Sequence, residues 1–422
     1  MVGCRGEPQP TLAGGWRPRA AGARGRGEGC LVSDAVSLWR KALAIWLPLQ
    51  HAEAAGFCVS TEPFLPEIAA RARQLALWDW RQSALAACAL GAQPWGGDPA
   101  DLPPASVDIA LLDLETLHGR ASFEQAARGA AAVLRPRGTL LLRGGNANGV
   151  GGAARRLRDW FGGVEAVAYG GGHRVLAAVR GERTALPGPP AVAWEQAELG
   201  GAVLRVRRTP GVFAEGLVDA GTGLLAEAAT ALAPGRRVCD LGCGTGLLGL
   251  ALLARGASTC AFCDEDLRAL AALRANLAAN TLPPAASTEV QAVDATVGVP
   301  GGPYDLVVCN PPFHQGIAVS HALSEAVVRA GWRALAPGGT MLVVGMRFLP
   351  LDRWLPGAEE VAGDRAYRVL AATRPRDAAR ERRGRGRPYA PSEVKGTRRR
   401  GGRGRRSQRE GAARARDDAD RV

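Results

Sequence analysis

An asparagine and two prolines follow an apolar run in the second half of the chain, in the order Asn310-Pro311-Pro312-Phe313. Residues 305–309 predict a buried strand, which places the motif at the carboxyl end of that strand, where ligands of α/β sheets bind. The Asn310 side-chain oxygen and the Pro311 carbonyl could accept both hydrogens of an amine conjugated into a planar ring. The same dipoles would stabilise positive charge developing on that nitrogen during methyl transfer. Pro311 and Pro312 fix the backbone, and Phe313 offers a face for stacking on the ring.

A glycine-rich turn lies upstream of this motif. Residues 238–241 predict a strand that ends in Gly242, Gly244 and Gly246. Glycines at this spacing let the backbone turn sharply and approach a ligand closely. The motif alone does not distinguish nicotinamide dinucleotides from S-adenosylmethionine (SAM).

Three acidic residues lie in or directly after predicted strands and favour SAM over a dinucleotide. Asp264 comes about twenty residues after the turn, where an acid accepts hydrogen bonds from ribose hydroxyls. Asp294 follows another strand-like run and could meet the adenine amine, and Asp240 would lie near a positively charged methionine moiety. Acids stabilise a sulfonium cation but repel a pyrophosphate. We therefore expect SAM as the cofactor.

The elements that must position these residues occur twice. Residues 107–112, 134–142 and 172–178 resemble residues 304–309, 335–343 and 366–372, in the same order and at offsets of 197, 201 and 194. Repeated segments in register indicate two copies of one domain. Opposite the Asn-Pro-Pro-Phe motif the first copy has Asp113-Leu114-Glu115-Thr116, and it lacks the early glycine turn. We expect the first copy to be catalytically inactive.

Alternating strand and helix patterns predict an α/β fold of two tandem Rossmann-like class I methyltransferase domains, the first degenerate. Helical patterns are expected over residues 35–39 and 68–77. We expect five parts: a disordered N-terminal extension over 1–32, the degenerate domain over 33–180, a linker over 181–202, the catalytic domain over 203–374, and a disordered Arg-rich tail over 375–422.

The net charge of +13 is concentrated at the C-terminus. From residue 374 to the end there are 17 Arg and one Lys against seven acids, so the folded part is close to neutral. We expect the tail to add salt-dependent, sequence-independent affinity for RNA. The N-terminus lacks an apolar signal-peptide core, and no apolar run is long enough to span a membrane. These patterns predict a soluble, cytoplasmic protein without membrane association.

The nine cysteines do not have the dense spacing of a secreted disulfide scaffold. Cys260-x-x-Cys263 is compatible with a zinc or redox site, but no second Cys pair or His pair completes such a site. We therefore expect no metal.

The glycine turn, the Asn310-Pro311-Pro312-Phe313-His314 segment and the degenerate first copy resemble the bacterial ribosomal RNA small-subunit methyltransferase C family and its large-subunit sister family. The resemblance covers residues 105–373 and is strongest over 210–350. It implies SAM-dependent methylation of the exocyclic N2 amine of a guanine in ribosomal RNA, 16S-type rather than 23S-type. The partner would be ribosomal RNA or a ribosomal subunit, with the target base in a loop or flipped from its stack.

The resemblance extends to a lead-in segment, Pro210-Gly211-Val212-Phe213 with Leu217-x-Asp219-x-Gly221-Thr222. In the family this segment packs over the cofactor, which implies that Phe213 and Thr222 lie near SAM. The chain departs from the family at Met346, where an Asn is common, in residues 34–100 and in the Arg-rich tail. The sequence does not indicate an oligomeric state or which guanine is modified.

Alternative functions use parts of the same pattern. Protein glutamine N5-methyltransferases and DNA adenine N6-methyltransferases also use Asn-Pro-Pro, the former with Tyr at the position of Phe313. A non-catalytic RNA-binding factor could keep a vestigial fold, although it would not need both motifs intact. A nicotinamide oxidoreductase leaves Asn310-Pro311-Pro312 unexplained.

Overall fold

The computed structural model describes residues 31–46, 52–161, 163–182, 192–312, 314–315, 318–319 and 321–376. The expected N-terminal extension lies outside these residues, except for positions 31–32, which begin a helix. The expected Arg-rich tail lies outside them from residue 377 onward.

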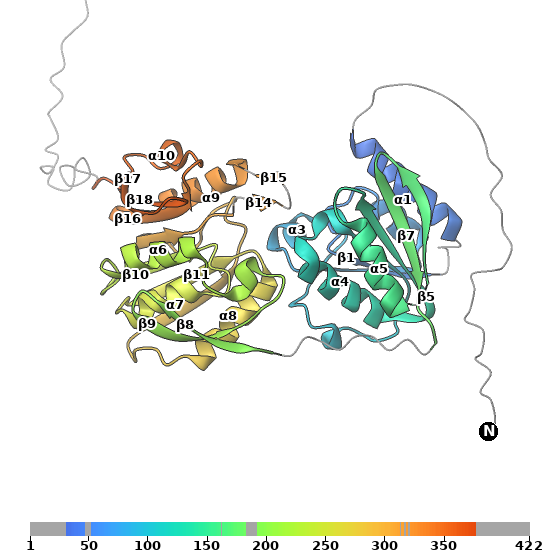
Figure 1. Cartoon of the computed structure of the whole chain (residues 1–422), viewed down its shortest axis with the longest axis horizontal. Helices are drawn as coiled ribbons and strands as arrows, with labels where there is room; N and C mark the ends of the chain where they lie inside the picture. Colours follow the sequence, from blue (N-terminus) through green and yellow to red (C-terminus); the bar gives the residue numbers. More distant parts are fainter. Residues whose placement is uncertain are drawn as a thin grey trace, which may run out of the picture. The chain divides into compact units, whose positions relative to one another are not determined.

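The first half is built on a seven-stranded sheet with the order β3-β2-β1-β4-β5-β7-β6 (Figure 1). All neighbouring strands are parallel except β7, which runs antiparallel to β5 and β6. The strands are β1 (Glu53–Phe57), β2 (Gln74–Asp79), β3 (Gln93–Pro94), β4 (Val107–Asp113), β5 (Leu134–Gly145), β6 (Val164–Gly170) and β7 (His173–Val179). The helices are α1 (Leu31–Trp46), α2 (Leu65–Arg71), α3 (Gln82–Ala87), α4 (Gly119–Val133) and α5 (Val150–Phe161), with short 3-10 turns η2 (Pro99–Asp101) and η3 (Leu114–Thr116).

The second half contains a seven-stranded sheet with the order β12-β11-β10-β13-β16-β18-β17. Its strands are β10 (Arg237–Leu241), β11 (Thr259–Asp264), β12 (Ser287–Ala292), β13 (Tyr304–Cys309), β16 (Leu335–Met346), β17 (Glu359–Gly363) and β18 (Tyr367–Thr373). Two small hairpins are formed by β8 (Trp194–Leu199) with β9 (Ala202–Arg207) and by β14 (His314–Gln315) with β15 (Ala318–Val319). The helices are η4 (Phe213–Gly216), α6 (Ala220–Thr230), α7 (Leu247–Ala254), α8 (Leu267–Ala279), α9 (His321–Arg333) and α10 (Leu351–Trp354).

Numbered by their place in each half, the strands of the two sheets have the same order, and in both sheets the seventh strand is the one that runs antiparallel to its two neighbours. The three repeated sequence segments fall on β4 and β13, on β5 and β16, and on β7 and β18. The prediction of two tandem α/β domains is therefore confirmed.

Each sheet is buried on both faces, which explains why its central strands are almost entirely apolar. In β13, Leu306 and Val308 face the core shared with α6, α7 and α8, whereas Val307 and Cys309 face the core shared with α9 and α10. The first half repeats this plan, with α4 and α5 on one face of its sheet and α1 and α2 on the other.

The structure differs from two sequence expectations. The predicted helical pattern over residues 68–77 is wrong in its second part, because α2 ends at Arg71 and β2 begins at Gln74. There the pairing of β2 with β1 and β3 overrides local helix propensity. The predicted linker over 181–202 contains β8, whose Leu199 packs into the core of the second half with Leu204 and Val206 of β9.

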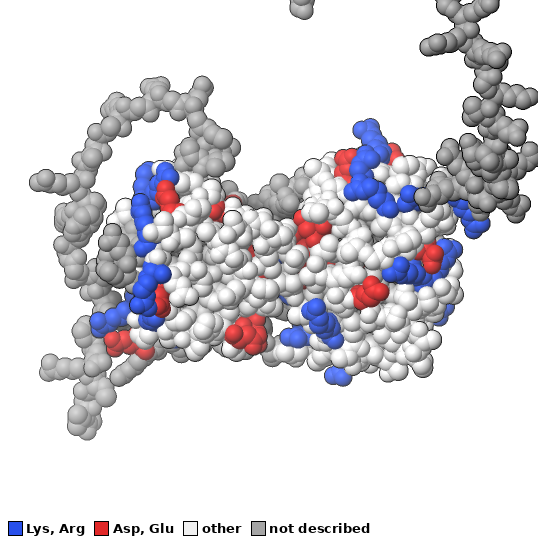
Figure 2. Space-filling view, turned by 180° about the vertical axis from the view of Figure 1, so that it is seen from behind, with Lys and Arg blue, Asp and Glu red and all other residues white. Residues whose placement is uncertain are grey.

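On the face shown in Figure 2, basic side chains lie in separate groups with acids among them, as expected for a folded part that is close to neutral. No helix among the described residues is both long and apolar enough to cross a membrane.

Candidate functional site

The Asn310 turn and the glycine turn lie side by side at the carboxyl edge of the second sheet. Strand β13 pairs in parallel with β10, with Cys309 opposite Leu241, so the residues that follow the two strands are neighbours. A Cβ added to Gly242 would come 4.0 Å from the Asn310 carbonyl oxygen. The topology thus brings together two motifs that are far apart in the sequence.

The Asn310 side chain is held through its amide nitrogen. Nδ2 donates to Thr222 Oγ1 at 3.1 Å and to Asp219 Oδ1 at 3.3 Å. Asp219 is the N-cap of α6, and its carboxylate accepts from the Gly221 and Thr222 backbone N–H groups. The Thr222 hydroxyl also donates to Asp219 Oδ1. The start of α6 therefore orients the Asn310 side chain.

The two prolines have different environments. Pro311 is buried and Pro312 is exposed. The Pro312 carbonyl accepts a 2.6 Å hydrogen bond from Ser324 Oγ in α9, which ties the turn to that helix. Phe313, the predicted stacking residue, lies outside the described residues.

The glycine turn has the backbone geometry that its sequence predicts. Gly242, Gly244 and Gly246 have φ values of 70°, 54° and 81°, in the left-handed region that favours glycine. A Cβ on Gly246 would lie 2.2 Å from Leu273 Cδ1, whereas one on Gly244 would have no heavy atom within 4 Å. The space beside Gly244 fits a ligand that approaches the backbone.

Asp264 binds this turn directly. Its Oδ2 accepts from the Gly244 N–H at 2.7 Å, and its Oδ1 accepts from the Asp266 N–H at 2.9 Å. Burial raises the pKa of Asp264 to about 6. The Asp264 carbonyl accepts from the Val293 N–H, which brings Asp294 to the adjacent loop. Asp264 thus ends β11, and Asp294 lies in the adjacent loop that follows β12.

Asp240 has a structural partner. It is almost fully buried, its Oδ2 accepts from the Gly249 N–H of α7 at 2.8 Å, and burial raises its pKa to about 7. This bond joins the end of β10 to the helix after the glycine turn. The predicted role of Asp240 next to a methionine moiety stays a prediction.

The lead-in segment packs on the glycine turn. Thr245 Oγ1 donates to the Gly216 carbonyl at 3.0 Å. Ala214 and Glu215 are held in the left-handed region, with φ values of 50° and 54°, which is uncommon for residues with a Cβ. Phe213, at the start of η4, is 61% exposed and so is free to cover a ligand.

The first half carries ion pairs at the corresponding positions. Asp79 ends β2 as Asp264 ends β11, and it is paired with Arg81. Asp113 ends β4 at the position that corresponds to Asn310, and it forms a buried ion pair with Arg143. These acids are neutralised by arginines of the same half, whereas Asp264 in the second half accepts hydrogen bonds from backbone N–H groups.

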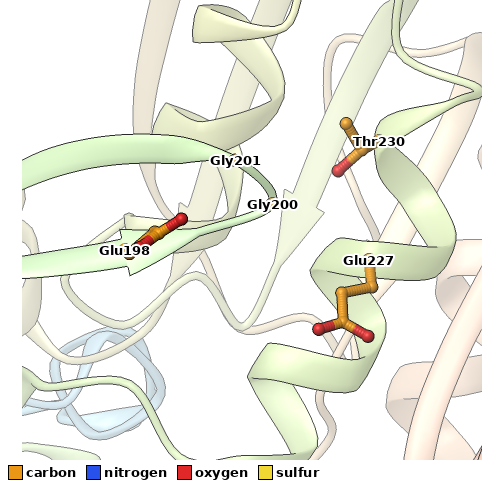
Figure 3. Close-up of a pocket in the computed structure, with 5 residues that line it drawn as sticks. All are labelled: Glu198, Gly200, Gly201, Glu227 and Thr230. Atoms are coloured by element: carbon orange, nitrogen blue, oxygen red, sulfur yellow. The ribbon is translucent and has the colours of Figure 1, made fainter.

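A pocket at the opposite end of α6 does not contribute to this site. It is lined by Glu198, Gly200, Gly201, Glu227 and Thr230 (Figure 3). Thr222 and Thr230 are eight residues apart on one helix, which corresponds to about 12 Å along its axis. Within the described residues, no group of three or more His, Cys, Asp and Glu side chains is placed to hold a metal ion, and Cys260 and Cys263 are both buried.

Asp219 is not among the site residues predicted from the sequence. A signal for it exists, because an Asp immediately before a helical pattern is typical of an N-cap. Its contact with Asn310 spans 91 positions of the chain and follows only from the fold.

Comparisons with known proteins match mainly the second half of the chain. The profile of the methyltransferase small domain family matches residues 203–371. The ribosomal RNA small subunit methyltransferase C of Chromohalobacter salexigens is 40% identical over 208 residues, which cover 48% of this chain and 60% of that relative. The ribosomal RNA large subunit methyltransferase G of Streptomyces coelicolor is 40% identical over 169 residues, covering 39% of this chain and 44% of that relative.

A solved structure extends the similarity beyond the second half. It is that of the T. thermophilus 16S rRNA N2 methyltransferase in complex with AdoMet and guanosine, with a TM-score of 0.67 and 27% identity. The match covers 76% of this chain and 88% of that one, so it includes both sheets. The sequence matches, in contrast, span 60% and 44% of the length of the two curated relatives.

Proposed function

The chain belongs to the ribosomal RNA small-subunit methyltransferase C family, and from this membership we propose that it methylates the exocyclic N2 amine of a guanine in 16S-type ribosomal RNA, with SAM as the methyl donor. One observation carries the proposal for this chain. The Asn310-Pro311-Pro312 turn and the glycine turn lie at the ends of two paired strands, β13 and β10. An amine bound at the first turn would face a methyl donor bound at the second.

The residues around the glycine turn fit SAM. The open space beside Gly244 accommodates a ligand, and Asp264 is placed to accept hydrogen bonds from ribose hydroxyls. Asp294, in the adjacent loop, would meet the adenine amine, and the exposed ring of Phe213 would cover the bound molecule. SAM supplies an electrophilic methyl group on a sulfonium.

In the proposed reaction Asn310 Oδ1 and the Pro311 carbonyl accept the two hydrogens of the guanine amine. This arrangement turns the nitrogen lone pair toward the methyl carbon. The new N–C bond forms as the S–C bond breaks, so the positive charge passes from sulfur to nitrogen, where the two acceptors stabilise it. The nitrogen then loses a proton to water, so no catalytic base is required before transfer.

The substrate would be single-stranded or flipped RNA, because a paired amine is not accessible. We propose that the protein acts in the cytoplasm on ribosomal RNA or on a ribosomal subunit. Met346, which ends β16 near the same edge of the sheet, stands where the family commonly has Asn. The acceptor turn and Phe313 would therefore recognise the base without that amide.

The test is methyl transfer from labelled SAM to naked ribosomal RNA and to both unmodified ribosomal subunits, with nucleosides identified by mass spectrometry. We expect N2-methylguanosine in small-subunit RNA. Asn310→Ala should lower the rate by about 100-fold, the typical effect of losing one preorganised polar group that stabilises the transition state.

Asn280→Ala is the matched control. It removes an amide that bonds to the Arg205 backbone at the far end of α8, where the helix returns to the amino edge of the sheet. This variant should keep the activity. Absence of label in every RNA, despite measurable SAM binding, would reject the ribosomal assignment, and glutamine peptides and DNA adenine would then be tested as acceptors.

A further inference from the structure

The amide group of Asn310 faces two acceptors on one side. Nδ2 carries two hydrogens, and the structure gives it two partners, Thr222 Oγ1 and Asp219 Oδ1. Both partners belong to the start of α6, an eleven-residue helix. The other end of the amide, Oδ1, is directed away from these two groups.

The chemistry of the partners determines which end of the amide faces them. An ionised carboxylate only accepts hydrogen bonds, so Asp219 requires the nitrogen of Asn310 and excludes its oxygen. The Thr222 hydroxyl gives its hydrogen to Asp219 Oδ1 and therefore also acts as an acceptor toward Asn310. Every hydrogen in this network points toward Asp219 or Thr222.

We propose that Asp219 and Thr222 are positioning residues, which hold Asn310 in the one amide orientation that presents Oδ1 to the substrate amine. This inference rests on the proposed function. A reversed amide would place Oδ1 against the Asp219 carboxylate and the NH₂ group against the hydrogens of the guanine amine. Both contacts would be repulsive, so the orientation decides whether the acceptor motif works.

Asp219 also acts on the electron distribution of the amide. Hydrogen bonds to an ionised partner are stronger than neutral ones, and linked hydrogen bonds polarise one another in a site of low dielectric constant. Donation from Nδ2 to the carboxylate increases the partial negative charge on Oδ1. Oδ1 then stabilises the positive charge on the reacting nitrogen more effectively.

The carboxylate is well placed for this task. Backbone N–H groups of Gly221 and Thr222 donate to it, and the first turn of a helix favours negative charge. This role differs from the one that the family resemblance implies for Thr222, which was contact with the cofactor. Asp219 had no assigned role in the sequence.

Three variants of the full chain test the proposal. Thr222→Val keeps the side-chain shape but loses the hydroxyl, Thr222→Ser retains the hydroxyl, and Asp219→Ser keeps an N-cap residue without the carboxylate. We expect kcat to fall about tenfold or more in Thr222→Val and Asp219→Ser and to stay within about twofold in Thr222→Ser, in line with the effects of removing single polar groups in preorganised sites. The Kd for SAM should stay within about twofold in all three. Asp98→Ser, which makes the same change at an N-cap in the first half, is the control for replacing a capping carboxylate by a hydroxyl.

A double-mutant cycle shows whether these residues act through Asn310. In the Asn310→Ala background, Thr222→Val should have no further effect on the rate, because the group it positions is absent. Equal rate losses with and without Asn310 would overturn the proposal. A raised Kd for SAM at unchanged kcat would also overturn it and would return Thr222 to the cofactor site.

A readout independent of activity separates this inference from the proposed function. The chain has five asparagines, so Asn-selective ¹⁵N labelling gives few side-chain signals, and Asn310→Ala identifies the one of interest. We expect the Asn310 NH₂ hydrogens to exchange with water several-fold faster in Thr222→Val than in Thr222→Ser. Unchanged exchange would reject the positioning role, whereas slow exchange in a protein without methyl transfer would reject only the proposed function.

Discussion

At the scale of single residues, two glycines near the turn are required for different reasons, one for ligand binding and one for packing. Gly244 has a positive φ and open space beside it, whereas Gly249 lies in α7 against β11. A Cβ on Gly249 would come 2.3 Å from Phe262 Cε1 and 2.8 Å from Cys260 Sγ. The first glycine therefore allows a ligand to approach, and the second allows a helix to approach a strand.

We expect Gly244→Ala to affect mainly SAM binding and Gly249→Ala to affect mainly stability. Gly244→Ala should weaken SAM binding about tenfold or more at a stability cost of about 1 kcal/mol, the cost of a left-handed Ala. Gly249→Ala should lower the free energy of unfolding by about 1–3 kcal/mol through overpacking, with SAM affinity unchanged in the folded protein. Urea unfolding and calorimetric titration measure the two quantities. The assignment of the space beside Gly244 fails if Gly244→Ala binds SAM normally.

Some site residues could be predicted from the sequence and others could not. Gly242, Gly244 and Gly246 were predictable because a turn with positive φ has few alternatives to glycine. Asn310 was predictable because a polar residue after an apolar strand has a fixed place in an α/β sheet. Asp219 and Ser324 were not assigned, since their contacts with Asn310 and Pro312 depend on how α6 and α9 pack against the sheet.

At the scale of elements, the carboxyl end of β11 should make cofactor binding depend on pH. The pKa of Asp264 is raised to about 6 by burial, so this carboxyl becomes protonated between pH 7 and pH 5. A carboxylic acid is a poorer acceptor than a carboxylate for ribose hydroxyls. We expect SAM affinity to fall about tenfold from pH 7 to pH 5, measured by calorimetric titration, because the ionised fraction falls by about that factor.

Asp264→Asn provides the control for this effect. An amide cannot titrate, so this variant should bind SAM more weakly at pH 7 and show a flatter pH profile than the unaltered protein. The same shift affects stability with a defined sign. Because the folded pKa is raised, the contribution of Asp264 to stability is present below about pH 4 and lost as the pH rises through about 6. A constant SAM affinity from pH 5 to pH 8 would show that Asp264 does not bind the ribose.

The order of the helices and strands was largely predictable from the sequence. The segments that were predicted incorrectly depend on contacts with distant parts of the chain. Three repeated segments in register predicted the second copy of the sheet, and the identical strand orders confirm it. The strand Gln74–Asp79 was missed because its apolar residues also fit a helical pattern, and only pairing with β1 and β3 decides between the two. Strand β8 was included in the predicted linker because it follows the Pro/Gly-bearing stretch of residues 186–190, although polar and apolar residues alternate in it as in a half-buried strand.

At the scale of the whole molecule, one buried arginine connects the two halves. Arg268 of α8 is 6% exposed, and its guanidinium lies 3.6 Å from the centre of the Trp80 ring. It donates to Asp266 at 2.6 Å and to Ser122 Oγ at 3.0 Å. The Ser122 hydroxyl donates in turn to the Gly211 carbonyl at the start of the lead-in segment. The first half thus contacts two segments that border the cofactor site.

We expect Arg268→Met to lower the free energy of unfolding by about 2–4 kcal/mol, because it leaves Asp266 and Ser122 without their buried partner. SAM binding should weaken as well, since the Asp266 N–H fixes Asp264 and Ser122 holds the lead-in segment. Arg329→Met is the matched control, because it breaks an exposed pair with Glu325 that contributes about 0.5 kcal/mol or less. Urea unfolding of the full chain and SAM titration measure both effects. If Arg268→Met is as stable as Arg329→Met, the first half does not support the cofactor site through this arginine, and its role would have to be sought in RNA binding alone.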